Sequence, residues 1–215
     1  RPTMRCDLPV GVAMQARRST LISAAAALAV CALAGAGPAH ACACCSNTGQ
    51  RMVDTEPVDD FAAGILSDVQ FAPAAHLYTG EGDVETLGGI ATKSTDFQLA
   101  VTKADGSWEL QFDDGAGGGT LTFALPKAIT RFEVDPREPI PEPGTGPVLY
   151  KEWRLTAPAV GSGMFKGATG GDQRATLILH GRGNSCTDAS QFDAWTLVLH
   201  GSKATNTLFG SLSAP

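Results

Sequence analysis

Four of the six cysteines in this chain are the residues best suited to chemistry. Three stand within four positions, at Cys42, Cys44 and Cys45, and the fourth is Cys186. Thiolates bind soft or borderline cations such as Cu(I) and Zn(II). We therefore expect these four cysteines to bind Cu(I) or Zn(II), with His180 as a further candidate ligand, mainly for Zn(II).

Disulfide bonding is the alternative fate of the same thiols. Because only Cys186 is distant, one N-terminal thiol would pair with it and the other two with each other. A Cys42–Cys45 bond is the least strained local choice, which predicts Cys42–Cys45 together with Cys44–Cys186. The Cys-x-x-Cys spacing also occurs in redox proteins, where it begins a helix in a βαβ setting that is not evident before Cys42.

The segment before the cysteines has the layout of a secretory signal. Arg17 and Arg18 form a charged start, and residues 21–36 form an uncharged Ala/Leu/Val run. Residues 39–41 supply the small residues that a signal peptidase reads. We expect residues 1–41 to be removed as a signal peptide, with residues 1–13 possible extra sequence upstream of the true start.

The expected location is the periplasm or the extracellular space. The apolar run is shorter than the roughly 20 residues of a membrane span, so no stable transmembrane segment is expected in the mature chain. The paired arginines leave Sec and Tat export both open. The Cys-Ala-Cys-Cys run resembles thiol-rich copper-handling proteins of the bacterial periplasm over four residues, which implies metal handling but no fold.

Composition narrows the class of partner. Removal of residues 1–41 takes away four arginines and one aspartate, which leaves 12 basic and 21 acidic residues and a net charge of −9. An acidic domain without a basic stripe argues against nucleic acid and against anionic membrane surfaces. A metal ion or a small ligand is the expected partner, and protein partners stay open.

The pattern of apolar residues predicts an all-β fold. A cysteine-rich lead-in at 42–56 is followed by a single all-β domain at 57–215, a barrel or a barrel-like sandwich of roughly eight strands. Apolar residues alternate around a hairpin turn at Asp105-Gly106. Residues 57–66 are expected to form a short helix with Phe61 and Ile65 toward the core, and residues 135–147 a proline-rich loop.

Two similar C-terminal strands each end in Leu-His-Gly, at His180 and His200. If the strands pair as a hairpin, six residues of strand separate these histidines by about 20 Å, too far for one ion. Acidic pairs such as Asp59-Asp60 are typical of turns, and the sequence has no Gly-x-Ser-x-Gly elbow. The sequence therefore favours a non-enzymatic protein: a metal-binding envelope protein or, alternatively, a disulfide-stapled β-barrel that binds an unknown ligand.

Overall fold

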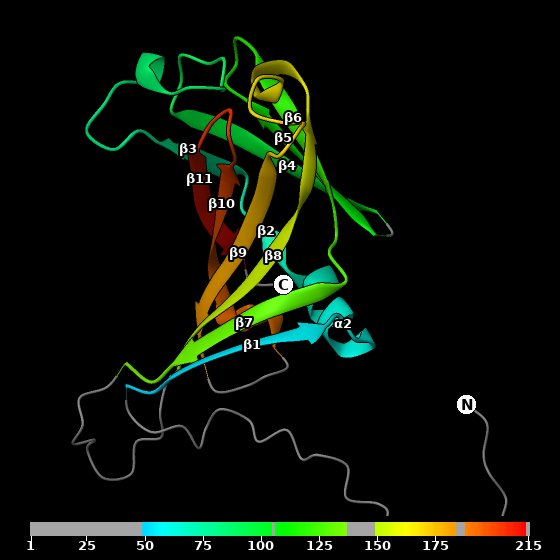
Figure 1. Ribbon diagram of the computed structural model, residues 1–215. Helices are drawn as coiled ribbons and strands as arrows, with labels where there is room; N and C mark the ends of the chain where they lie inside the picture. Colours follow the sequence, from blue (N-terminus) through cyan, green and yellow to red (C-terminus); the bar gives the residue numbers. More distant parts are fainter. Residues whose placement is uncertain (1–48, 105, 137–148, 184–187, 214–215) are drawn as a thin grey trace, which may run out of the picture. The chain divides into compact units, whose positions relative to one another are not determined.

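The computed structural model describes residues 49–104, 106–136, 149–183 and 188–213. The expected signal peptide, the four cysteines and most of the proline-rich loop lie outside these residues. The all-β prediction is confirmed, because eight antiparallel strands close into a barrel (Figure 1). The barrel strands are β3 (Ala74–Tyr78), β4 (Asp96–Ala104), β5 (Ser107–Asp113), β6 (Gly118–Ala124), β8 (Tyr150–Gly161), β9 (Arg174–Arg182), β10 (Phe192–His200) and β11 (Asn206–Ser213).

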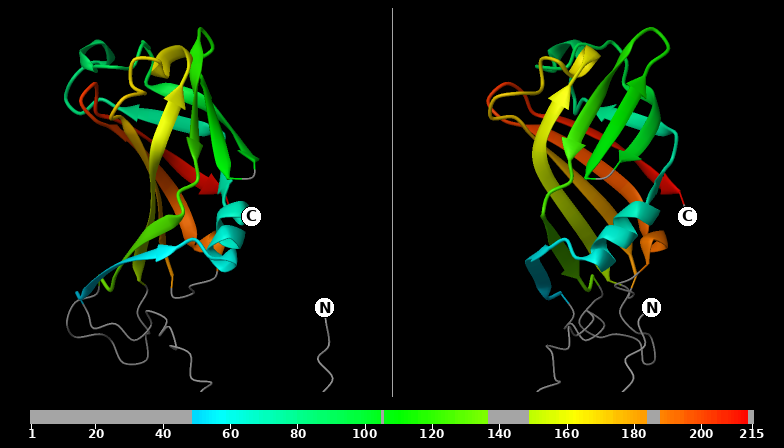
Figure 2. Two further views of the ribbon diagram at one scale, coloured as in Figure 1. Left: turned by 45° about the vertical axis from the view of Figure 1, so that its right-hand side comes forward. Right: turned by 90° about the vertical axis from the view of Figure 1, so that its right-hand side faces the viewer.

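The strands follow the order β8, β6, β5, β4, β3, β11, β10 and β9 around the barrel, and β9 pairs back with β8 to close the ring. The other elements attach to this ring, and Figure 2 shows the same arrangement from two further sides. These elements are β1 (Arg51–Pro57), α2 (Asp60–Asp68), β2 (Gln70–Phe71), β7 (Ala128–Val134) and the short 3-10 turns η2 (Val84–Thr86), η3 (Gly163–Phe165) and η4 (Ala189–Gln191).

Strand β8 changes its neighbour halfway along its length. Residues 150–154 pair with β7, and residues 159–161 pair with β6. Pro158 lies at the change. Because Ser162 N–H donates to the Thr120 carbonyl of β6, the even-numbered N–H positions of β8 point to that side, where Pro158 has no N–H to offer. Pro158 lies between the stretch of β8 that pairs with β7 and the stretch that pairs with β6, so its missing N–H removes no hydrogen bond from either pairing.

The expected hairpin is present between β4 and β5, with Ala104 opposite Ser107. Gly106 has a φ of +74°, the left-handed conformation that a two-residue turn requires and that glycine adopts without strain. Strand alternation then turns every second residue of β4 and β5 inward, and Trp108, Leu110 and Phe112 are all buried. The predicted alternation is confirmed here.

Side chains fill the barrel interior. The three tryptophans, Trp108, Trp153 and Trp195, are buried, with Trp195 fully so. Phe71 lies edge-on to Trp108 and tilted against Trp195, at ring-centroid distances of 5.8 and 5.7 Å. Such aromatic pairs add stabilisation beyond the area that they bury.

The expectation for residues 57–66 is corrected. The helix begins later than expected because the Asp59 carboxylate accepts the Ala62 N–H and caps it, and Phe61 is 45% exposed rather than in the core. The buried face is formed by Ala62, Ile65 and Leu66. The second half of the lead-in forms strand β1, which pairs with β7 along its whole length.

Candidate functional site

The predicted ligands Cys42, Cys44, Cys45 and Cys186 lie outside the described residues, and His180 is the one predicted ligand that the structure places. The described residues contain no group of three or more His, Cys, Asp or Glu side chains arranged to hold a metal ion. His180 lies near the end of β9, opposite Ala194 of β10. The described residues that bear on a thiol site are therefore those next to the cysteine-bearing segments.

Those flanking residues, Gly49 and Gly183, lie at the same end of the sheet. Gly49, four positions after Cys45, donates its N–H to the Asp135 carbonyl just beyond β7, at 2.8 Å. Gly183, three positions before Cys186, donates to the Leu149 carbonyl just before β8, at 2.9 Å. Because β1 pairs with β7, β7 with β8 and β8 with β9, these two anchor residues, Gly49 and Gly183, lie at the same end of four consecutive strands.

His180 belongs to a hydrogen-bonded network with Tyr150 and Glu152 of β8 and Thr196 of β10. The Tyr150 hydroxyl donates to Glu152 Oε1 at 2.6 Å and lies 2.9 Å from His180 Nδ1. Since the single hydroxyl proton goes to Glu152, Nδ1 carries a proton and donates to the Tyr150 oxygen. Nε2 is then unprotonated and accepts from the Thr196 hydroxyl at 2.8 Å.

The electrostatics of this network keep the histidine neutral and the glutamate charged. Burial lowers the pKa of His180, although the Glu152 charge opposes it. Burial alone would raise the pKa of Glu152, but hydrogen bonds from Tyr150 and Arg154 outweigh it and hold the pKa below its usual value. Burial and donation to Glu152 raise the pKa of Tyr150. A metal ion at either nitrogen of His180 would have to displace Tyr150 or Thr196.

The other two described histidines lie apart from this network. His200 Nε2 lies 3.2 Å from the Thr176 hydroxyl, and His200 is six positions along β10 from Ala194, the partner of His180. His76, on β3, pairs with Asp96 of β4 at 2.7 Å. The register therefore separates His180 from His200, as the hairpin argument predicted.

A second polar group, the inner charged cluster, lies on the inner face of β1, β7 and β8. It is defined by Glu56, Arg131, Glu133 and Lys151. Arg131 binds Glu56 at 2.8 Å and stacks over Trp153. Lys151, although only 4% exposed, donates to Gln191 at 2.8 Å.

Burial changes the pKa of one carboxylate in the inner charged cluster. Desolvation raises the pKa of Glu133, while the cations Lys151 and Arg131 act in the opposite direction. Buried charges of this kind are retained in proteins when they are paired. Sequence reasoning missed the cluster, and the interruption of the apolar pattern at Lys151 was its only signal.

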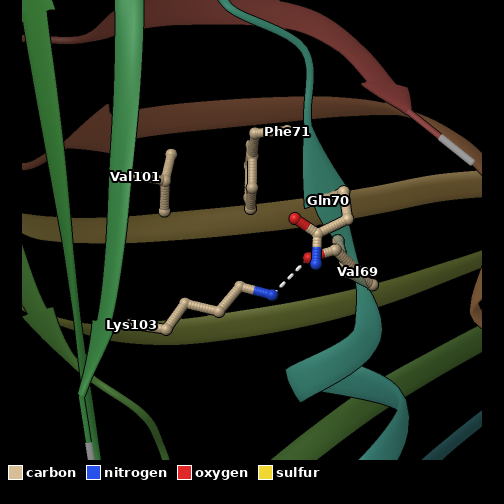
Figure 3. A pocket seen from close by; sticks show the side chains of 5 residues that line it. All are labelled: Val69, Gln70, Phe71, Val101 and Lys103. Carbon is tan, nitrogen blue, oxygen red and sulfur yellow. Dashed lines mark hydrogen bonds between the residues drawn. The ribbon is translucent and has the colours of Figure 1, made fainter. Parts of the chain in front are cut away.

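A pocket of about 250 Å³ lies between β2 and β4, lined by Val69, Gln70, Phe71, Val101 and Lys103 (Figure 3). The Lys103 side chain reaches across it to the end of α2. Its ammonium donates to the carbonyls of Leu66 and Ser67, at 2.9 and 3.0 Å, and to that of Val69. Burial lowers the pKa of Lys103 to about 8, with the Asp68 charge opposing the shift.

Comparison with known proteins identifies no family. No protein-family model and no curated protein matches the sequence, and no solved structure matches the chain. Within the described part of the chain, no helix has both the length and the apolar character to cross a membrane. Function is therefore inferred from the residues and contacts of this chain alone.

Proposed function

We propose that the chain is an exported cell-envelope protein whose barrel holds a Cu(I) or Zn(II) ion through Cys42, Cys44, Cys45 and Cys186. The observation that carries the proposal is that Gly49 and Gly183 lie at the same end of the sheet. Three strand spacings separate these anchors, about 14 Å at 4.8 Å per spacing. The cysteine-bearing segments leave the described residues from these two points.

Chain length permits the four thiols to come together. Cys45 is four residues from Gly49 and Cys186 is three from Gly183, so the two segments reach about 13 and 10 Å when extended. Their combined reach exceeds the spacing between the anchors. Adjacent thiolates are difficult to pair as unstrained disulfides, whereas Cu(I) and Zn(II) accept several of them at once.

The experiment isolates the protein anaerobically from its native compartment. Intact mass should correspond to residues 42–215, and metal analysis should give one equivalent of copper or zinc per chain. Cys44→Ser should abolish stoichiometric metal, because it removes a central donor. His200→Ala, a change on β10 away from the anchors, should leave metal content intact. Equal metal content in the wild type and in a Cys42/Cys44/Cys45 triple serine variant would refute the metal site.

A disulfide-stapled binding module is the second candidate function, favoured by the pocket between β2 and β4. In this alternative Cys42 pairs with Cys45 and Cys44 with Cys186. Thiol titration of the anaerobically isolated protein separates the candidates. Four free thiols with bound metal support the first, and no free thiols without metal support the second.

A further inference from the structure

The barrel wall has a gap beside β4. Strand β11 pairs with β3 at residues 207–209 and with β2 at residues 212–213. Strand β4 pairs with β3 only at residues 96–98. The rest of β4 has β5 on one side, and β2 lies on the other without pairing to it. The pocket in Figure 3 occupies this gap.

The main chain of β4 presents unused hydrogen-bonding groups to the gap. Leu99 N–H donates to the Pro73 carbonyl, away from β5. Because N–H and C=O groups of alternate residues point to the same side of a strand, those of Val101 and Lys103 also point away from β5. No described residue pairs with these four groups. They form a short open strand edge inside the pocket.

The opposite wall of the pocket, formed by β2, also presents main-chain hydrogen-bonding groups to the gap. Ala72 N–H donates to the Ser211 carbonyl of β11, so alternation directs the N–H and C=O of Phe71 away from β11 and toward the gap. The Phe71 ring forms an apolar wall packed on Trp108 and Trp195. A ligand in the pocket would therefore lie close to two tryptophans.

The lysine ammonium is already engaged. Lys103 Nζ has three carbonyl acceptors at the end of α2 and lies 4.9 Å from the centroid of the Trp108 ring. An ammonium has three protons to donate, so this one has none left for an anionic ligand. The polar groups that remain for a ligand are the main-chain groups of the strand edge and the side-chain amide of Gln70, whose Nε2 donates to the Asp68 carbonyl at 3.4 Å. Main-chain groups along a strand edge have another main chain as their natural complement.

We propose that this pocket binds an extended peptide segment, which adds a short strand to the edge formed by Val101 and Lys103 and packs an apolar side chain against Phe71. In such strand addition, main-chain hydrogen bonds supply affinity and side-chain pockets supply selectivity. The volume lies just below the range of about 300–1,000 Å³ for ligand pockets, so the bound stretch is only a few residues long.

The proposal deepens the second candidate function and rests on its binding-module part, the pocket between β2 and β4, and not on the disulfide staple. Its test involves no cysteine, so the peptide site and the disulfide staple can fail separately. A metal-binding result at the cysteines would leave the strand edge unaffected, because the edge lies on β4 between residues 101 and 103.

The test uses the ¹⁵N-labelled full chain and the capped peptide acetyl-Thr-Val-Thr-amide. In the free protein, the amide hydrogens of Val101 and Lys103 should exchange much faster than that of Thr102, which faces β5. Saturating peptide should slow exchange at Val101 and Lys103 and change the tryptophan fluorescence. The same peptide N-methylated at valine, which lacks one donor, should do neither.

Two variants distinguish main-chain pairing from apolar contact. Val101→Pro removes the edge N–H without removing a ladder bond to β5, and should abolish peptide binding. Val101→Ala keeps that N–H and should retain most of the binding. Equal binding by Val101→Pro and Val101→Ala would overturn the proposal. Slow exchange at Val101 and Lys103 in the free wild-type protein would also overturn it, and that measurement does not depend on the folding of a variant.

Discussion

At the scale of single residues, the burial of His180 within its hydrogen-bonded network makes the stability of the fold depend on pH. Burial lowers the pKa of His180 in the folded protein below the unfolded value of 6.5. The unfolded chain therefore binds more protons at pH values just below 6.5, and the free energy of unfolding rises with pH in that window. The contribution of neutral His180 is fully present above pH 6.5 and is lost as the pH falls.

We predict that the unfolding free energy of the wild type decreases between pH 7.5 and 5.5, and that it decreases less in His180→Gln. Urea unfolding at the two pH values measures this difference. Long-range ¹H–¹⁵N correlation spectra should show His180 protonated at Nδ1, with a titration midpoint below that of the same residue in urea. Protonation at Nε2, or a midpoint at or above the unfolded value, would contradict the hydrogen bonds assigned to Tyr150 and Thr196.

At the scale of elements, Lys103 holds the end of α2 in place. Helix carbonyls at the C-terminus have no partner within the helix, and a cation there also complements the helix dipole. Lys103 supplies both effects from β4, since it binds the carbonyls of Leu66, Ser67 and Val69. The helix is thereby attached to the barrel wall at its last turn.

We predict that Lys103→Met lowers the unfolding free energy by about 1–3 kcal/mol, because it leaves carbonyls without their charged donor. Urea unfolding measures the loss, and amide hydrogens of α2 should exchange faster in the variant. Lys93→Met is the matched control, because Lys93 is exposed; it should stay within about 0.5 kcal/mol of the wild type. Equal stability of the two variants would show that the lysine does not hold the helix.

Strands in which apolar and polar residues alternate regularly could be predicted from the sequence. Strands without a clear apolar face could not. The β4–β5 hairpin follows from apolar residues at every second position and a glycine in the turn. Strand β1 was missed because most of its side chains are exposed and its pairing with β7 depends on distant residues. Phe61 was placed in the core because helical spacing alone does not show which face of α2 meets the barrel.

At the scale of the whole molecule, closure of the barrel brings residues that are far apart in the sequence to the same end of the sheet. Strand β8 pairs with β7 on one side and with β9 on the other, so Asp135 and Gly183 lie just beyond the ends of the two strands that flank β8. Gly49 joins them through its bond to Asp135. The sequence identified the thiols, but the approach of their flanking residues depends on closure of the sheet.

The same closure explains why the inner charged cluster and the pocket could not be predicted. From the sequence alone, Arg131 and Lys151 would be expected at the surface because they are charged. The pairing of β7 with β8 instead places both side chains on the inner face of the sheet. The pocket exists because β2 and β3 both pair with β11 while only β3 pairs with β4. Such features belong to the register of the whole sheet rather than to any strand.

The central claim is that Cys186 and the N-terminal cysteines form one site. Its most direct test is the Cu(I) affinity of the reduced full chain, measured by competition with a chromophoric chelator, for the wild type and for Cys186→Ser. Changes outside the direct ligands of a metal already cost 10–100-fold in affinity, so loss of a ligand predicts a decrease of at least about tenfold. An affinity unchanged in Cys186→Ser would contradict the account, because it would place the metal on the N-terminal cluster alone.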